Sequence, residues 1–358
     1  MELRRIAIMT AWNVDSGVFM HAEPIVKTWI DMGYEVRVFT FIKEDFHGTV
    51  IIGEDEPYVT RCFGTSVKTN FLDPRPFLLE DYDIFVVEDL KMLPMKNLAL
   101  IFPIIKRKAK VVVHIMHEST IYGDPPPQPP EFYAFDWDAV VYIEKTQEWF
   151  IKKIYGDKAH YIPFPCYPER RGDKEECRKK LGLPLDKKLV LVYARGGYMP
   201  YLPALPDKDL EDTYFLVITN KDFKWKYPQT EIRKTGPLTN QELDEYAFAS
   251  DAIILHKIMA PPFPTAVTST AVYQFIGTLR PLLVPKISES FEPFNGEVLK
   301  YTNRAELKEL LVDALNMGER TREALEKARN FVKERDPKKI ARMFIDLFEK
   351  LISEKNIA

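Results

Sequence analysis

Two histidines stand at the end of an apolar run, VVVHIMHE, at residues 111–118. Imidazole titrates near neutral pH, so it serves as an acid, a base or a metal ligand. Alternation along a strand places His117 on the same side as Val113 and Ile115, with His114 on the opposite side. The two rings therefore do not form one metal site, and no third ligand follows at zinc-site spacing. We expect no metal here, and we interpret His114 as a hydrogen-bonded core residue.

His117 is the better candidate for chemistry, because it leaves the predicted sheet together with Glu118 and Ser119. Ligands of parallel sheets bind outside the carboxyl ends of the strands. The alternative is an exposed loop histidine. The loop that follows, GDPPPQPP at 123–130, resists helix formation and sheet pairing because proline lacks an N–H. It either shapes an acceptor site beside a cleft or serves as a surface spacer.

A second motif follows another apolar run, in LVLVYARGGYMP at 189–200. Arg195 would hold a phosphate through two parallel hydrogen bonds. Gly196 and Gly197 carry no Cβ, so their backbone N–H groups could approach the same anion. The sequence thus predicts a phosphate-binding loop, and the alternative is a glycine turn with a surface arginine.

Hydroxyl side chains form a third candidate, within PTAVTSTAVYQFIG at 264–277. Thr268, Ser269 and Thr270 would present hydroxyls and helix N-terminal amides to a phosphate, although capping would account for one of the three. Gly17 lies in another strand-to-helix loop. The sequence contains no G-x-G-x-x-G fingerprint, P-loop or nucleophile elbow. This argues against a nicotinamide cofactor, and we expect no bound cofactor.

Two series of alternating strands and helices must position these motifs. Continuous apolar runs are typical of parallel strands covered on both faces. The predicted strands are 4–10, 35–41, 83–89, 111–116, 139–144, 188–194, 214–219, 252–256 and 281–285. Helices are predicted around 25–30 and at 145–156, 173–181, 239–249, 268–277 and 305–316. The sequence therefore predicts an α/β protein with two Rossmann-like, doubly wound parallel-sheet domains that face a cleft.

Length and a proline-rich segment set the predicted domain boundaries. A chain of 358 residues exceeds the ~250–300 at which one core stops growing. The segment YIPFPCYPERRGDKEE interrupts the pattern, so we place one domain at 1–165 and the next at 172–335. The last helix, 336–358, starts with Asp336 as N-cap and Pro337 at its first position. Its apolar stripe needs a surface to cover.

Composition narrows the partners and the compartment. The net charge of −3 gives no basic excess that would predict nucleic-acid binding. Three cysteines at neither disulfide nor metal spacing, and an opening run too short for a signal peptide, predict a cytoplasmic protein. No run approaches the ~20 apolar residues of a membrane span, which leaves peripheral membrane contact open. Few glutamines among many lysines and glutamates favour a heat-adapted source.

The order of segments resembles GT-B glycosyltransferases, particularly the large retaining family 4, also called group 1. RRIAIMTAWNVDSGVFMHAEPIVKTWIDMGYEVRVFT is similar to the opening of that family. DAVVYIEKTQEWFIKKIYGDKAHYIPFP resembles the end of its first domain, and KEECRKKLGLPLDKKLVLVYARGG the entry to its donor domain. TGPLTNQELDEYAFASDAIILH is similar to the helix and strand before the donor-site motif.

The resemblance implies roles for the two domains and for three residues. The second domain would bind a nucleotide diphosphate sugar, such as a UDP- or GDP-sugar, and the first a carbohydrate or lipid-linked acceptor. His117 would contact the donor sugar, Arg195 would neutralise the diphosphate, and the backbone of Leu238 would meet the base. No bound metal is implied, and the last helix would cross back onto the first domain.

The sequence departs from the family pattern at three positions. Pro200 stands where the family has a lysine, and Ala266 and Gln274 stand where it has two glutamates. Gln274 could still hydrogen-bond a ribose, whereas Ala266 carries no polar side chain. Lys257 or the hydroxyls at 268–270 could supply compensating contacts. Retaining and inverting chemistry both stay open.

The leading hypothesis is therefore a glycosyltransferase that moves a hexose from a nucleotide diphosphate sugar to an unidentified acceptor. One alternative is a non-catalytic GT-B-like protein that binds a nucleotide or a glycan. Another is a sugar-nucleotide epimerase.

Overall fold

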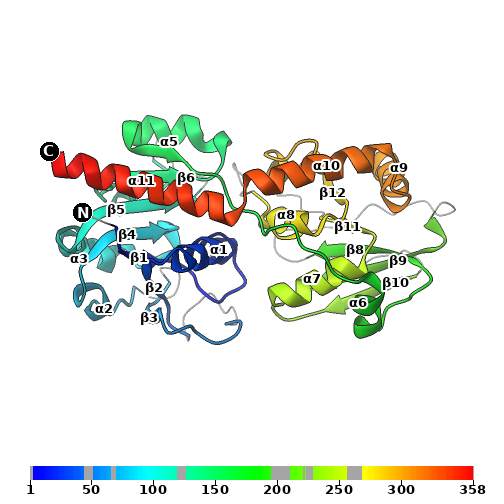
Figure 1. Ribbon diagram of the computed structural model, residues 1–358, viewed down its shortest axis with the longest axis horizontal. Helices are drawn as coiled ribbons and strands as arrows, with labels where there is room; N and C mark the ends of the chain where they lie inside the picture. The colour runs from blue at the N-terminus through cyan, green and yellow to red at the C-terminus, as the bar shows by residue number, and fades with distance from the viewer. Residues whose placement is uncertain are drawn as a thin grey trace. The chain divides into compact units, whose positions relative to one another are not determined.

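The computed structural model describes residues 3–43, 51–65, 70–118, 126–194, 210–220, 222, 229–255 and 268–357. The chain divides into two compact units (Figure 1). Unit 1 comprises Met1–Pro165 and Pro337–Ala358, and unit 2 comprises Cys166–Asp336. Each unit contains one parallel sheet flanked by helices, which confirms the predicted pair of doubly wound α/β domains.

The sheet of unit 1 has the strand order β3-β2-β1-β4-β5-β6-β7, and all neighbours are parallel. Its strands are β1 (Arg5–Met9), β2 (Glu35–Phe41), β3 (Val59–Phe63), β4 (Tyr82–Glu88), β5 (Ala109–Met116), β6 (Ala139–Tyr142) and β7 (Ala159–Tyr161). The chain runs outward from β1 through β2 and β3, then returns to the other side of β1 as β4. The loops after β1 and β4 therefore diverge, which is where ligands bind in such sheets.

Helices cover both faces of this sheet. One face is covered by α1 (Gly17–Asp31) and α11 (Pro337–Ile357), and the other by α2 (Arg75–Leu78), α3 (Met95–Lys108), α4 (Pro130–Tyr133) and α5 (Glu148–Tyr155). Side chains alternate along each strand. On β4, Phe85 contacts Phe77 of α2, whereas Glu88 contacts His21 of α1. The polar end of β4 therefore lies on the α1 face.

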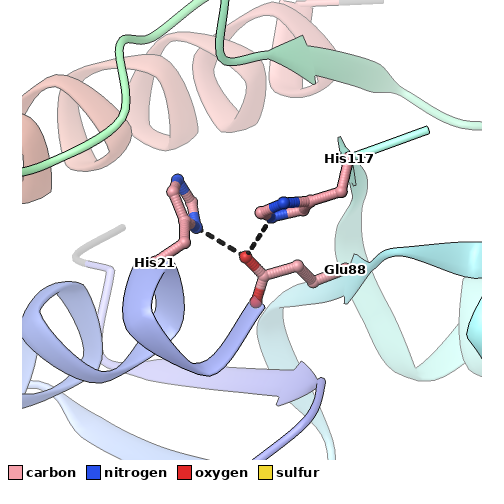
Figure 2. Close-up of side chains that lie close together, drawn as sticks. All are labelled: His21, Glu88 and His117. Atoms are coloured by element: carbon pink, nitrogen blue, oxygen red, sulfur yellow. Dashed lines mark hydrogen bonds and ion pairs between the residues drawn. The ribbon is translucent and has the colours of Figure 1, made fainter. Parts of the chain in front are cut away.

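Local sequence signals fix where α1 begins and ends. The hydroxyl of Ser16 accepts a hydrogen bond from the backbone N–H of Phe19 at 3.1 Å, which caps the helix. Gly33 follows the helix with a φ of +92°, the left-handed conformation that favours glycine and ends helices. The helix starts shortly after β1, so His21 in its second turn lies beside the ends of the strands (Figure 2).

The apolar stripe of α11 packs on α1. Trp29 is fully buried, and the centroid of its ring lies 5.8 Å from that of Phe344 and 5.7 Å from that of Phe348. The indole N–H of Trp29 donates to the carbonyl of Ala341 at 3.2 Å, so the one polar atom of the side chain is satisfied. The last helix thus completes the core of unit 1, although unit 2 precedes it in the sequence.

The sheet of unit 2 has the order β10-β9-β8-β11-β12-β13 and is also parallel throughout. Its strands are β8 (Lys188–Ala194), β9 (Thr213–Thr219), β10 (Thr230–Lys234), β11 (Ala252–Ile254), β12 (Leu282–Pro285) and β13 (Leu299–Tyr301). Its helices are α6 (Lys174–Leu181), α7 (Asn240–Ala249), α8 (Thr270–Phe275), α9 (Arg304–Leu315) and α10 (Glu319–Glu334). Because β8 lies between β9 and β11, this sheet has the same kind of switch point as unit 1.

The sequence missed four strands, and all four are edge strands. β3 and β7 border the sheet of unit 1, and β10 and β13 border that of unit 2. Edge strands are only partly covered, so sequences such as TEIRK lack the continuous apolar run by which the interior strands were predicted. The helix predicted at 268–277 is shorter and covers only Thr270–Phe275. Within the described ranges, no helix is long and apolar enough to cross a membrane.

Removing the Trp29 ring should destabilise unit 1. We expect Trp29→Ala to lower the free energy of unfolding by ~3–5 kcal/mol, because it leaves a cavity between α1 and α11. Trp149→Ala is the matched control, since that ring on α5 is 63% exposed, and it should cost less than ~1 kcal/mol. Urea denaturation followed by circular dichroism measures both. Equal losses in the two variants would contradict the packing described.

Candidate functional site

Three side chains converge at the carboxyl end of the sheet in unit 1 (Figure 2). His21 projects from α1, Glu88 from the end of β4 and His117 from the end of β5. Nδ1 of His21 lies 2.5 Å and Nε2 of His117 lies 2.8 Å from the same atom, Oε1 of Glu88. The hydroxyl of Thr10 donates to Oε2 of Glu88 at 2.6 Å. We call His21, Glu88 and His117 the His–Glu–His cluster.

Strand order brings the cluster together. β1, β4 and β5 are neighbours in the sheet, and Thr10, Glu88 and His117 stand at their carboxyl ends. Seventy-eight positions separate Thr10 from Glu88 in the sequence, and 29 separate Glu88 from His117. The cluster occupies the switch point beside β1 and β4, the place where a doubly wound sheet binds its ligand.

Glu88 is a buried carboxylate whose charge is stabilised by its neighbours. Burial alone would raise its pKa, but the charges and hydrogen bonds of His21 and His117 lower the pKa of Glu88 to about 2. A carboxylate accepts hydrogen bonds and donates none. The network therefore assigns the donor hydrogens to Nδ1 of His21 and Nε2 of His117. With Thr10, three donors offset the desolvation of this group.

The two histidines of the cluster differ in protonation. Burial lowers the pKa of His21, and this outweighs the opposing effect of Glu88. Phe164 and Phe344 lie against the His21 ring, at centroid distances of 5.1 and 6.2 Å. Burial also acts to lower the pKa of His117, but the hydrogen bond and charge of Glu88 outweigh it and raise that pKa. The pKa values of the two histidines therefore move in opposite directions, that of His21 down and that of His117 up.

His117 is also the member that a ligand can reach. Its side chain is 8% exposed, whereas the side chains of His21 and Glu88 are 0% exposed. Because Nε2 is bound to Glu88, Nδ1 is the ring nitrogen left for a ligand. His117 directly follows β5, at the strand end where the sequence placed it, and its low exposure argues against the alternative of an exposed loop histidine.

The cluster has the composition of a metal site, which the sequence spacing did not predict. The three ligand atoms lie within 4.8 Å of one another, and two histidines with one carboxylate would suit a zinc or iron ion. The distances of 2.5 and 2.8 Å to one Glu88 oxygen are hydrogen-bond distances. A metal-bound histidine also donates its other ring N–H to a partner, and Nε2 of His21 has none in the described chain. The geometry favours a hydrogen-bonded cluster.

A second carboxyl pair lies next to the cluster. Burial and the charge of Asp89 raise the pKa of Glu118 to about 8. Burial likewise raises the pKa of Asp89, to about 6. The backbone N–H of Lys91 donates to Oε1 of Glu118 at 2.9 Å, and Asp89 adopts a left-handed φ of +53°. Burial thus raises the pKa of Glu118 above its usual range, whereas the hydrogen bonds and charges around Glu88 lower the pKa of that group.

The prediction that His114 is hydrogen-bonded is wrong. Its ring is buried on the face opposite His117, with Trp137 at 5.1 Å and Phe132 at 6.1 Å between centroids. Neither ring nitrogen has a hydrogen-bond partner among the described residues. Oε2 of Glu118 is 3.7 Å away, beyond hydrogen-bond distance. Burial lowers the pKa of His114 to about 3, so the ring is a neutral aromatic group of the core.

The other predicted site residues fall in three places. Gly17 is the first residue of α1, in the same unit as His117 and Glu118. Unit 2 contains Leu238, Thr268, Ser269, Thr270 and Gln274. The four residues Arg195, Gly196, Gly197 and Lys257 lie outside the described residues. The fold therefore groups His117 and Glu118, and leaves the proposed phosphate contacts to unit 2.

Within unit 2, Thr268, Ser269, Thr270 and Gln274 lie in or directly before the short helix α8, whereas Leu238 lies before α7. Ser269 is buried next to its start, and its hydroxyl makes no capping hydrogen bond, so the capping alternative is not observed for this residue. Gln274 is buried, and the oxygen and nitrogen of its side-chain amide have no partner among the described residues. Its backbone carbonyl accepts a hydrogen bond from Arg170 at 2.6 Å. Leu238 precedes Thr239, the N-cap of α7.

Sequence reasoning missed His21 and Glu88. A signal for Glu88 was present, because a charged residue that ends the apolar run DIFVVE is buried with its strand and then needs partners. His21 carried a weaker signal, since a single histidine on the apolar face of a helix is more often a core residue. Their pairing depends on strand order, which periodicity does not reveal.

Solved structures resemble the chain over almost its full length, whereas no protein-family model matches the sequence. Sucrose-phosphate synthase from Thermosynechococcus elongatus is 14% identical, covers 98% of this chain and 100% of its own, and has a TM-score of 0.64. HepE from Anabaena, solved with UDP and glucose, is 11% identical, with coverages of 97% and 100% and a TM-score of 0.65. The N-terminal domain of trehalose-6-phosphate phosphatase from Candida albicans is 11% identical, with coverages of 98% and 97% and a TM-score of 0.61.

These similarities define the class of fold. The chain has the GT-B fold of glycosyltransferases. Sequence identities of 11–14% show the architecture and not the reaction. The function must therefore be argued from the site.

The carboxyl pair should make stability depend on pH. The pKa of Glu118 is raised in the folded state, from 4.5 to about 8. The contribution of this group to the free energy of unfolding is therefore fully present below about pH 4.5 and is lost progressively as the pH rises to about 8. Glu118→Gln removes that penalty, and we expect it to gain roughly 1–3 kcal/mol relative to the wild type between these limits. Thermal and urea unfolding at pH 5 and pH 8 measure the difference. Glu80→Gln, at a half-exposed carboxylate of the same unit, is the control, and an identical pH slope for all three proteins would contradict the prediction.

Proposed function

We propose that the protein is a glycosyltransferase that moves a hexose from a nucleotide diphosphate sugar to the hydroxyl group of an acceptor. The observation that carries this proposal is the match of nearly the whole chain to sucrose-phosphate synthase and to HepE, the latter solved with UDP and glucose. Transfer needs a donor site and an acceptor site. Two separately folded sheets, each with its own switch point, are suited to supply one each.

Unit 2 would bind the donor. Arg195, Gly196 and Gly197 follow β8, which borders the switch point of this sheet. An arginine and exposed backbone amides suit a diphosphate and would stabilise the charge that develops on the leaving nucleotide, without requiring a bound metal. The side-chain amide of Gln274, which has no partner among the described residues, suits a ribose hydroxyl, because a buried amide without a partner is costly. The backbone of Leu238 would meet the base.

Unit 1 would bind the acceptor. Its switch point holds His117, whose Nε2 is bound to Glu88 and whose Nδ1 is left for a ligand, and the His–Glu–His cluster contains no lysine or arginine. Such a site suits a neutral hydroxylated molecule, of which a carbohydrate or the glycan of a lipid-linked acceptor is the expected class.

A protein that binds a nucleotide or glycan without transfer is the second candidate. Ala266 and Gln274 stand where family 4 enzymes have two glutamates. One structure with this fold is the N-terminal domain of a phosphatase, so the fold accommodates more than one function. Stabilisation by a nucleotide sugar without turnover would favour this candidate.

A thermal-shift screen against UDP-, GDP- and ADP-sugars, followed by assays of transfer and hydrolysis with labelled donors, tests the proposal. UDP-glucose is the first donor to try, because HepE was solved with UDP and glucose. We expect at least one nucleotide sugar to raise the melting temperature and to be consumed. A folded protein that neither binds nor consumes any of these donors would rule the proposal out.

Replacing Arg195 gives a sharper test of donor binding. Arg195→Ala should weaken the affinity for the nucleotide diphosphate sugar by about tenfold or more, because it removes charge-assisted hydrogen bonds worth ~1.5–3 kcal/mol. Arg171→Ala is the matched control, since its side chain is 86% exposed and its ion pair with Glu169 is long, at 3.4 Å. Isothermal titration calorimetry measures both affinities. Unchanged binding in Arg195→Ala would remove this residue from the donor site.

A further inference from the structure

We propose that His117 is the general base that takes the proton from the acceptor hydroxyl, and that Glu88 is the positioning residue that orients it. The inference rests on the proposed function, because it concerns the chemical step of that reaction. It adds a proton acceptor, which the resemblance to family 4 does not assign to His117.

The hydrogen bond to Glu88 fixes which nitrogen of His117 is basic. Nε2 carries the hydrogen that Glu88 accepts at 2.8 Å, so the lone pair of the neutral ring is on Nδ1. A histidine whose second nitrogen is held by a carboxylate is the arrangement by which enzymes orient a base toward a hydroxyl. Thr10 donates to the other oxygen of Glu88 at 2.6 Å and His21 to the same oxygen as His117 at 2.5 Å, so both oxygens are held and the carboxylate cannot easily turn away.

His117 rather than His21 is in a position to do this. The side chain of His21 is fully buried, its Nδ1 is bound to Glu88, and its ring packs on Phe164 and Phe344. A ligand therefore has no access to it. His117 packs edge-to-face on His21 at 5.1 Å and keeps a partly exposed side chain.

The step conserves atoms and charge. The acceptor oxygen forms a bond to the anomeric carbon of the donor sugar while the bond from that carbon to the diphosphate oxygen breaks, and its electron pair leaves with the nucleotide diphosphate. The O–H bond of the acceptor breaks, and its proton goes to Nδ1 of His117. The imidazolium that results is stabilised by the negative charge of Glu88, since the two groups form an ion pair at 2.8 Å.

The groups around His117 strengthen it as a base. Glu88 and Asp89 approach from the end of β4, Glu118 and the neutral His114 from β5, and His21 from α1. The carboxyl groups of Glu88, Asp89 and Glu118 all raise the pKa of His117. Two uncharged rings also lie close to the cluster: Phe164 at 6.4 Å from His117 and Phe344 at 6.2 Å from His21 between centroids.

The sign of the pH dependence separates a base from a hydrogen-bond donor. A general base works when unprotonated, so kcat/KM should rise with pH through an apparent pKa above the ordinary 6.5 of histidine. An imidazolium that only donates a hydrogen bond to the donor sugar would work when protonated, and kcat/KM would fall over the same range.

The test is a pH–rate profile of kcat/KM for the wild type, His117→Asn, Glu88→Gln and the control His160→Asn, whose ring lies on β7 outside the cluster. Hydrolysis of the donor serves as the assay if no acceptor is known, because water then takes the place of the acceptor hydroxyl. We expect His117→Asn to lose about 10²–10⁴-fold in kcat/KM. Glu88→Gln should move the rising limb to lower pH and lower the plateau, while His160→Asn should match the wild type.

Each outcome decides a different claim. If the folded wild type turns over none of the donors, the proposed function is refuted, and so is the role of His117 as general base in it. Three results would refute the role of His117 as general base and leave the proposed function standing. They are full turnover by His117→Asn, a kcat/KM that falls instead of rising with pH, and stoichiometric zinc or iron at the cluster in elemental analysis. Circular dichroism shows whether His117→Asn folds. If it does not, two measurements decide the question: whether kcat/KM of the wild type rises or falls with pH, and whether the apparent pKa of that change moves to lower pH in Glu88→Gln.

Discussion

One buried carboxylate organises the candidate site of unit 1. Glu88 ends an interior strand, where its side chain is fully enclosed, and an isolated charge there would be very costly. Hydrogen bonds from Thr10, His21 and His117 offset that cost. His21 lies on α1, and Thr10 and His117 directly follow β1 and β5. The need to satisfy a single carboxylate therefore ties together the elements that border the switch point. The available nitrogen of His117 is a consequence of the same requirement.

The two units share a strand order but differ in the chemistry at their switch points. In unit 1, β1 lies between β2 and β4, and in unit 2, β8 lies between β9 and β11. The first switch point holds titratable side chains, which suit proton transfer. The second is bordered in sequence by Arg195 and two glycines, which suit an anion. A reaction that removes a proton from one substrate and releases a diphosphate from another needs both kinds of group, and this complementarity supports the glycosyltransferase proposal.

Periodicity predicted what depends on local sequence. Interior strands such as 35–41 and 188–194 were predicted at their observed bounds, because burial on both faces leaves a continuous apolar run. Edge strands were missed for the converse reason. Alternation placed His117 and His114 on opposite faces, but it gave no information on the partners of either ring. The pairing of His21 with Glu88 could not be predicted, since it spans 67 positions and exists only because β4 lies beside β1.

The central claim is that Glu88 accepts hydrogen bonds from both histidines and thereby sets their tautomers. Long-range ¹H–¹⁵N correlation spectra of the histidine rings test it most directly at high pH, where both rings are neutral. The account predicts a hydrogen on Nε2 of His117 and on Nδ1 of His21, and predicts that Glu88→Gln lowers the pKa of His117. A hydrogen on Nδ1 of neutral His117, or a His117 pKa that Glu88→Gln leaves unchanged, would contradict it.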